Sequence, residues 1–505
     1  MKCGKGAGFP LFLPRANVPA SARLRGTWGV AGSIFGRRKG LDDWQNYSGN
    51  RALRRTLTWP HLIALGVGAI VGTGIYTLIG IGAGKAGPAV IVSFAIAGLV
   101  CACAALAYAE LATMMPAAGS AYSYSYVALN EPVAWIVGWS LVLEYTVVCA
   151  AVAVGWSGYA VGFLNSWGVT IPHEFAAGPH AGGILNVPAV VITMAVAGLL
   201  ALGTRESAFV NTLLVLLKMS ALALFIILAL PAFDSANLEP FAPYGWGSEE
   251  IGGNTVGVMA GAALIFFAFY GFDAVSTAAE EAKDPSRDLT IGIIGSMLIC
   301  TVVYMAVAAA AIGAMPVAEF SASSEPLAHV LRALDWPVAA QLIGAGAIVA
   351  MPTVLLAFMY GQSRIFFAIA RDGLLPERLS HVNARTGTPI LMTMVTAVVV
   401  SIIAGLLPLG EIAELANTGT LAAFTAIGIS LIVLRRRAPN AKRQFRVPFH
   451  LPVALIAIGG CLYLFISLPD KTQLRFLVWN LIGAGVYLAY GVRQSLIAAA
   501  SRKEA

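Results

Sequence analysis

The chain runs repeatedly for about 18 to 25 residues with hardly a charged side chain, which is the length a helix needs to cross the hydrocarbon core of a bilayer. Only 11% of the 505 residues are charged and 58% are hydrophobic, whereas soluble domains usually carry about 25% charged residues. We therefore predict an all-α integral membrane protein with twelve transmembrane helices. The predicted spans lie near 61–84, 88–113, 133–161, 185–203, 208–230, 254–281, 290–314, 338–370, 389–407, 412–434, 451–468 and 475–493.

Several other classes of protein have no support in the sequence. The apolar runs do not alternate with polar residues, as the strands of a membrane β-barrel would. The six cysteines form no CxxC pair and five lie inside apolar runs, so we expect neither disulfides nor a metal site. No phosphate-binding loop and no nucleophile–base constellation is present. We therefore do not expect an enzyme, and ATP-driven transport would need a partner protein. No cofactor is expected apart from a coupling ion, for which H⁺ is the candidate.

The Lys and Arg residues are distributed unevenly over the predicted connections. If residues 1–58 lie in the cytoplasm, 27 of the 32 Lys and Arg residues fall on that side and four fall outside, in agreement with the positive-inside rule. The net charge of +7 then reflects topology and not nucleic-acid binding. Both termini are predicted to be cytoplasmic, with a disordered basic tail at 1–58, a ten-helix transport core at 59–435, two additional helices at 436–495 and a short tail at 496–505.

The first span contains four glycines within the nine residues 66–74. Glycine destabilises a helix interior by up to about 1 kcal/mol relative to alanine, so this run favours a break in the helix. Gly72 lies about 16 Å along the helix from the start of the span, near the middle of the bilayer. A break at that depth exposes backbone N–H groups that bind a carboxylate. The alternative is a face of small residues for close helix packing.

The sixth span contains an aromatic run that ends in Gly271, Phe272 and Asp273. An aspartate at membrane depth is unfavourable, and beside a glycine it indicates an unwound segment whose free carbonyls hold an ammonium group. The aromatic run alone would indicate only packing. Interrupted helices at matching places in two halves of a chain are typical of a transporter site, although the two halves otherwise align poorly here.

Two charged residues lie deep within predicted spans. Lys218 is in the middle of the fifth span, too far from either surface to extend its amine into water. Because burial favours the neutral amine, Lys218 is a candidate for binding and releasing protons, and a static tie to backbone carbonyls is the alternative. Glu144 in the third span is expected to pair with Lys218, to line the cavity or to neutralise a cationic substrate.

Short motifs at the ends and in the middle of these spans resemble those of one family. They are GAIVGTGIY at 68–76, YAEL at 108–111, PAAGSAY at 116–122, FAFYGFD at 267–273, EE at 280–281, DPSRDL at 284–289, YGQSRIFF at 360–367 and RDGLLP at 371–376. Together they resemble the amino acid–polyamine–organocation (APC) superfamily, and within it bacterial members of the cationic amino acid transporter family. The resemblance extends from about residue 57 to residue 493.

The resemblance implies a LeuT-type fold, with a 5+5 inverted repeat, broken first and sixth helices and two additional C-terminal helices. It also implies how an amino acid is held, between those two broken helices. The residues implied for its α-carboxylate are Gly72, Thr73 and Gly74, through their amides, and those implied for its α-ammonium are Ile70, Phe267, Ala268 and Tyr270, through their carbonyls.

Three further positions are carried over from the same resemblance. Lys218 matches the lysine that, in proton-coupled members, stands where sodium-coupled relatives bind an ion. Glu144 and Met351 match positions that face the side-chain pocket. The chain departs from the family at Tyr270, where many relatives have isoleucine, and at Pro352, where a small or polar residue is usual.

We therefore expect a secondary active transporter, an amino acid permease of the inner membrane that carries L-amino acids in symport with protons by alternating access. The apolar lining and Met351 favour neutral substrates, and Glu144 permits lysine or arginine. The alternatives are an amino acid or polyamine exchanger without net proton coupling and a non-transporting nutrient sensor on the same fold. Apart from substrate and lipid no partner is expected, and the carrier is expected to work as a monomer.

Overall fold

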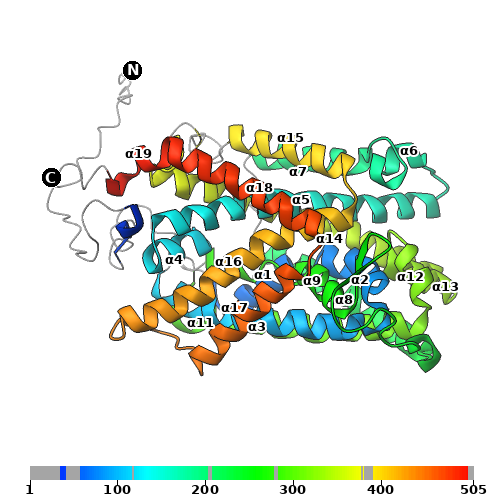
Figure 1. Cartoon of the computed structure of the whole chain (residues 1–505). Coiled ribbons are helices and arrows are strands. Elements are labelled where there is room, and N and C mark those ends of the chain that lie inside the picture. Colours follow the sequence, from blue (N-terminus) through cyan, green and yellow to red (C-terminus); the bar gives the residue numbers. More distant parts are fainter. Residues whose placement is uncertain are drawn as a thin grey trace, which may run out of the picture.

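The computed structural model describes residues 34–40, 57–115, 119–202, 208–277, 282–376, 379 and 390–498. These residues form a bundle of helices, most of which run along its length (Figure 1). Within the described ranges, seven helical segments are long and apolar enough to cross a membrane, and five shorter apolar helices of 10–17 residues lie among them. The prediction of an all-α membrane protein is confirmed, and the helices occur at the predicted positions.

The helices of the first half are α1 (Trp59–Ile70), η3 (Gly74–Leu78), α2 (Ile79–Ala86), α3 (Val90–Met114), α4 (Ser120–Ala128), α5 (Glu131–Ser166), α6 (His173–Ala176), α7 (Val187–Ala201) and α8 (Ala208–Ala229). A hairpin of β1 (Glu249–Ile251) and β2 (Asn254–Val256) follows. The second half contains α9 (Val258–Ile265), η8 (Phe266–Phe269), α10 (Phe272–Thr277), α11 (Pro285–Ala314), α12 (Val317–Ala322), α13 (Pro326–Ala333), α14 (Pro337–Arg371), α15 (Ile390–Leu406), α16 (Leu409–Arg437), α17 (His450–Ile466), α18 (Asp470–Val486), η11 (Tyr487–Gly491) and α19 (Val492–Gln494).

The first predicted span is interrupted within its glycine run. Helix α1 ends at Ile70, and Val71 has extended backbone angles (φ −76°, ψ 102°). The chain resumes at Gly74 with one π-helical turn, η3, that continues directly into α2. The helix therefore breaks where four closely spaced glycines weaken it most.

The sixth predicted span is interrupted as well. After α9 the chain tightens into the 3₁₀ turn η8, and Tyr270 is extended (φ −64°, ψ 153°) before α10 begins. Gly271 between them has a φ of +105°, a conformation that glycine adopts without steric penalty. A Cβ at Gly271 would also lie 2.7 Å from the backbone of Ala69 in α1. Glycine is therefore required here by both conformation and packing.

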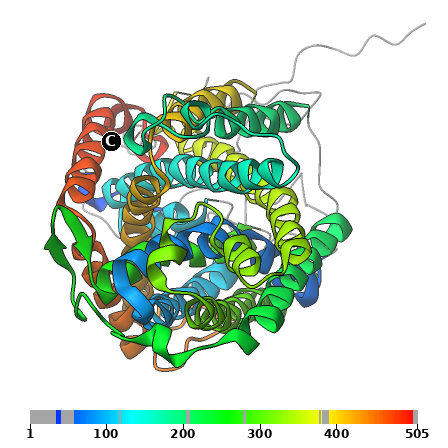
Figure 2. The same cartoon turned by 90° about the vertical axis from the view of Figure 1, so that its right-hand side faces the viewer.

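The two interrupted helices lie against each other inside the bundle. Helix α1 contacts α10, and η3 contacts η8. The long helix α5 packs against α14 and α16, while α17 packs on α3 and α16. Figure 2, viewed along the bundle, shows α7 and α15 side by side at one edge and the β1–β2 hairpin at another. This arrangement encloses the interruptions on several sides.

Residues 34–40 are a described segment within the predicted tail at 1–58. They contain a 3₁₀ turn, η1 (Ile34–Gly36), followed by two cations that dock on the bundle. Arg37 Nη1 lies 3.2 Å from Glu131 Oε1 at the start of α5, and Lys39 Nζ lies 2.6 Å from Asp372 Oδ1 at the end of α14. The remainder of that tail up to residue 56, apart from this segment, and the tail beyond 498 lie outside the described residues.

Candidate substrate site between the interrupted helices

The two interruptions approach each other through small residues. A Cβ at Gly74 would overlap the Cα of Ala268 and lie 2.6 Å from its Cβ, so only glycine allows η3 to lie this close to η8. Helix α5 approaches from a third side at Gly155, where a Cβ would lie 2.9 Å from Thr73 Oγ1. Three segments that are distant in the sequence thus meet at one place.

A small cavity of about 10 Å³ lies at this meeting point, with room for about one water molecule. Most of the side chains that line it are aliphatic or aromatic, so its wall is apolar. An amino acid enters such a space only if the surrounding helices separate. The cavity is lined by Ala69, Ile70, Gly72, Thr73, Gly74, Val148, Val152, Phe267, Tyr270, Val354 and Phe358.

The cavity brings together six of the seven residues predicted to bind the substrate backbone, and the seventh, Ala268, lies directly behind Gly74. Within the described ranges, the amides of Gly72 and Thr73 form no hydrogen bond. The carbonyl of Ile70 accepts a hydrogen bond from Tyr304 Oη at 2.9 Å, and a carbonyl retains a second lone pair. The interruption thus holds backbone N–H groups without a hydrogen-bond partner in the described ranges, and a carbonyl that can accept one more hydrogen bond.

Lys218 does not line this cavity but contacts α1 at Gly68. Its side chain is completely buried in α8. Its Nζ donates to the carbonyl of Gly68 at 2.8 Å and to Thr353 Oγ1 at 3.2 Å. The Tyr76 hydroxyl donates in turn to the Lys218 carbonyl at 3.3 Å. Lys218 therefore ties α8 to both sides of the first interruption and to α14.

Met351 and Glu144 lie outside the set of residues that line the cavity. Met351 is fully buried in α14 and its Sδ accepts a hydrogen bond from Thr73 Oγ1 at 3.8 Å. Glu144 is buried in α5 where that helix meets α16, and a Cβ at Gly419 would lie 3.0 Å from Glu144 Cβ. Neither residue lines the cavity in this conformation.

The sequence interpretation missed Asn417, which connects α16 to the sixth-span interruption. The Tyr270 hydroxyl donates to Asn417 Oδ1, and the Asn417 amide donates to the carbonyls of Ala263 and Leu264 at 2.5 and 3.1 Å. The available signal was an amide within the apolar run 412–434, because polar side chains at membrane depth are commonly functional. The aliphatic wall formed by Val148, Val152 and Val354 carried no such signal.

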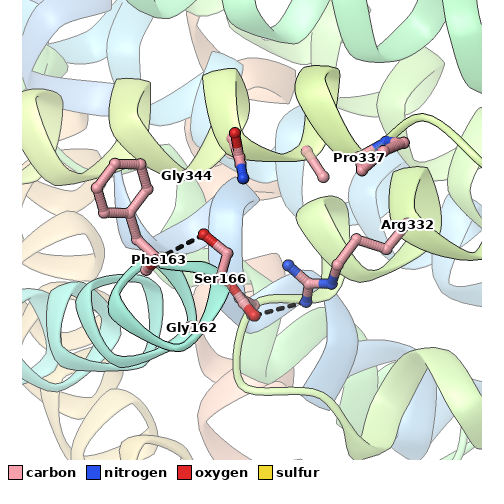
Figure 3. Close-up of a pocket in the computed structure, with 9 residues that line it drawn as sticks. Gly162, Phe163, Ser166, Arg332, Pro337 and Gly344 are labelled. Atoms are coloured by element: carbon pink, nitrogen blue, oxygen red, sulfur yellow. Dashed lines mark hydrogen bonds and ion pairs between the residues drawn. The ribbon is translucent and has the colours of Figure 1, made fainter. Parts of the chain in front are cut away.

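A larger cavity of about 50 Å³ lies elsewhere, between the end of α5, the helix α13 with the preceding Glu325, and the start of α14. Figure 3 shows Arg332 extending across it below Pro337, with Phe163 and Ser166 on the opposite wall. Arg332 Nη2 lies 2.5 Å from Glu325 Oε1. Burial raises the pKa of Glu325 above its ordinary value, even though Arg332 acts in the opposite direction. None of the predicted site residues lines this cavity.

Comparison with known proteins places the chain among membrane transporters. The family model described as amino acid permease matches residues 57–489. The branched-chain amino acid permease BcaP of Bacillus subtilis is 43% identical, with 92% of this chain and 99% of that protein covered. The methylthioribose transporter of the same organism is 42% identical with the same coverage. The vacuolar cationic amino acid transporter 2 of Arabidopsis thaliana is 37% identical over 82% of this chain and 65% of its own length.

Proposed function

The chain belongs to the amino acid permease family of the APC superfamily, and from that premise we propose that it is a proton-coupled symporter of L-amino acids that works by alternating access. The proposal includes twelve spans in the LeuT-type arrangement, both termini in the cytoplasm, location in the inner membrane and a monomeric working unit. No enzymatic step is part of it, and the only coupling species is H⁺.

The observation that carries this proposal is the pairing of two interrupted helices around one cavity. The unused amides of Gly72 and Thr73 lie at the break in the first helix, where backbone N–H groups favour an anion such as the α-carboxylate. Ile70 and Phe267 line the same cavity, and their carbonyls are the proposed acceptors for the α-ammonium group, together with those of Ala268 and Tyr270. Both ends of an amino acid backbone thereby have complementary partners.

The wall of the cavity favours an uncharged aliphatic side chain. Val148, Val152, Val354 and Phe358 present apolar surface to it, and burying an aliphatic group there is favourable by about 0.8 kcal/mol per methylene. Relatives named for branched-chain amino acids agree with this preference. Lysine and arginine remain possible substrates for two reasons. Some relatives are named for cationic amino acids, and the Glu144 carboxyl could pair with a cationic side chain.

Lys218 is the proposed site of proton coupling. Its amine donates to the Gly68 carbonyl in the last turn of α1, next to the break that holds the substrate. A charged donor forms a stronger hydrogen bond than a neutral one. Gain or loss of a proton at Lys218 would therefore alter how firmly α1 is held to α8, which links proton binding to the movement that opens or closes the site.

Uptake of labelled leucine, alanine and arginine into proteoliposomes, with and without an inward proton gradient, tests this function. We expect gradient-driven accumulation by the wild type and its loss in Lys218→Ala. Lys471→Ala, at an exposed lysine, is the matched control and should behave as wild type. Exchange of equal concentrations of substrate across the membrane needs no net proton movement, so it should persist in Lys218→Ala and would show that this variant is folded.

Other outcomes identify the competing functions. Uptake that ignores the gradient and requires internal amino acid would show an exchanger. Binding of amino acids without flux would show a sensor. Because one relative is named a methylthioribose transporter, that sugar is tested in parallel, and its uptake in the absence of any amino acid uptake would overturn the proposed substrate class.

A further inference from the structure

Tyr270 occupies a position between the cavity and a buried carboxylate. Its side chain lines the cavity and is 4% exposed. Glu144 does not line the cavity. It packs on α16 at Gly419, where a Cβ would lie 3.0 Å from Glu144 Cβ, two positions from Asn417, to which the Tyr270 hydroxyl donates. The Tyr270 ring thus lines the cavity, and its hydroxyl is held on the same stretch of α16 that Glu144 contacts.

The ring is held rigidly in that place. Its hydroxyl donates to Asn417 Oδ1, whose own amide is used by two carbonyls of the last turn of α9. Asn417 is completely buried. The Tyr270 ring also lies 5.0 Å from the Phe267 ring and 5.9 Å from the Phe266 ring, between centroids. With the ring fixed on both its polar and apolar sides, rotation away from the cavity would break several interactions together.

The carboxyl group of Glu144 is incompletely satisfied by hydrogen bonds. Glu144 is 4% exposed, and its Oε2 has no hydrogen-bond partner in the described part of the chain. No ion pair to Glu144 is found among the described residues either. A buried carboxylate without a cation is unfavourable, and an ammonium or guanidinium group brought within reach would satisfy it.

We propose that Tyr270 determines which substrate side chain is accepted, by both size and charge. Its ring forms the end wall of the apolar cavity that takes an aliphatic side chain, and it separates Glu144 from the substrate. A smaller residue at position 270 would remove this wall and lengthen the cavity. Glu144 would then contact the end of a lysine or arginine side chain. This inference rests on the proposed amino acid site. It assigns Tyr270 a role in selecting the side chain in addition to its carbonyl's proposed contact with the substrate backbone.

Competition uptake and binding with leucine and lysine test the inference in three variants. Tyr270→Phe keeps the ring and should keep the wild-type ranking of the two amino acids. Tyr270→Ile removes the ring and should shift the lysine-to-leucine ratio at least tenfold toward lysine, about 1.4 kcal/mol. Tyr270→Ile combined with Glu144→Gln should lose this gain while still accepting neutral side chains larger than leucine.

Tyr270→Leu is made in parallel, because it retains more of the buried volume if isoleucine impairs folding. Thermal stabilisation of the purified variants by each amino acid gives a readout that does not depend on flux. An unchanged ranking in both aliphatic variants would overturn the role of Tyr270. A lysine gain that survives Glu144→Gln would overturn the role of Glu144. Failure of the wild type to bind or carry any amino acid would instead count against the proposed function.

Discussion

Gly74 allows two interrupted helices to approach more closely than any other residue would permit. A Cβ there would overlap the backbone of Ala268, and neither segment can retreat easily because both are enclosed by other helices. We expect Gly74→Ala to destabilise the protein by about 1–3 kcal/mol through overpacking and to abolish uptake. Thermal unfolding and proteoliposome uptake of the purified variant are the measurements.

Gly459→Ala is the matched control for that substitution. Gly459 lies in α17, and apart from its chain neighbours and the backbone of its own helix no atom lies within 4 Å of a Cβ built there. The same added methyl should leave uptake unchanged and leave stability unchanged or slightly higher, because alanine is the better helix former. Equal effects of the two substitutions would show that the close contact with Ala268 is not the reason why alanine is unfavourable at position 74.

At the scale of single residues, the glycines and the buried charges could be predicted from the sequence. Their identification needs only the residue type and its position within an apolar span. The run around Gly72 and the depth of Lys218 can both be read without knowing any neighbour. The partner of Tyr270 could not be read in this way, since Asn417 is 147 positions away. Which helix faces which is decided by packing between segments of similar hydrophobicity, and that information is absent from a single sequence.

At the scale of elements, a buried carboxylate joins the end of α3 to the second half of the chain. Glu110 accepts from Arg435 Nη2 at 2.6 Å, from Arg443 Nε at 3.0 Å and from the Val447 amide at 2.8 Å. The side chains of Glu110 and Arg443 are each 1% exposed. This cluster fixes the connection between α16 and α17 against the core.

Glu110→Ala should therefore be strongly destabilising. It removes the acceptor of a buried arginine, and breaking a buried ion pair typically costs about 3–5 kcal/mol. Glu411→Ala removes an ion pair with Arg475 whose side chains are 42% and 32% exposed, so it should cost no more than about 1 kcal/mol. Thermal unfolding of both variants in one detergent checks the difference, and similar losses would contradict the assignment of Glu110 as a tie between elements.

The long apolar helices could be predicted well because bilayer thickness dictates their length. Predicted and observed bounds differ by few residues for α5 and α14, for example. Helix α4 and the β1–β2 hairpin were not predicted. They lie in connections, where length and hydrophobicity are not constrained by lipid and contacts with the bundle determine the conformation.

At the scale of the whole molecule, residues 34–40 connect the N-terminal and C-terminal parts of the chain that the structure describes. Glu131 accepts from Arg37 Nη1, from the Tyr126 and Tyr487 hydroxyls and from Ser495 Oγ. Arg37 also donates to the Val492 carbonyl at 3.2 Å. The N-terminal segment, the start of α5 and the helix at the C-terminus are thereby held at one buried carboxylate, at the end of the bundle where α4 and α19 lie (Figure 1).

Arg37→Ala and Lys39→Ala should each lower stability for the same reason. Each removes the cation beside a carboxylate whose side chain is almost fully buried, 0% exposed for Glu131 and 4% for Asp372. The hydroxyl donors that remain, such as Tyr122 Oη at 2.6 Å from Asp372 Oδ2, satisfy the carboxylates only in part. We expect a loss of about 1–3 kcal/mol for each variant, the penalty of an unsatisfied buried polar group, measured as a lower unfolding temperature of the full chain.

Arg38→Ala is the control that separates specific contacts from charge alone. Burial and the nearby positive charge of Arg437 lower the pKa of Arg38, so its charge is disfavoured where it stands. Removing it should leave stability unchanged or slightly higher, although it deletes the same charge from the same segment. If all three variants lose stability equally, the basic character of the segment and not its two ion pairs holds the ends of the chain together, and raising the salt concentration should then weaken the wild type as well.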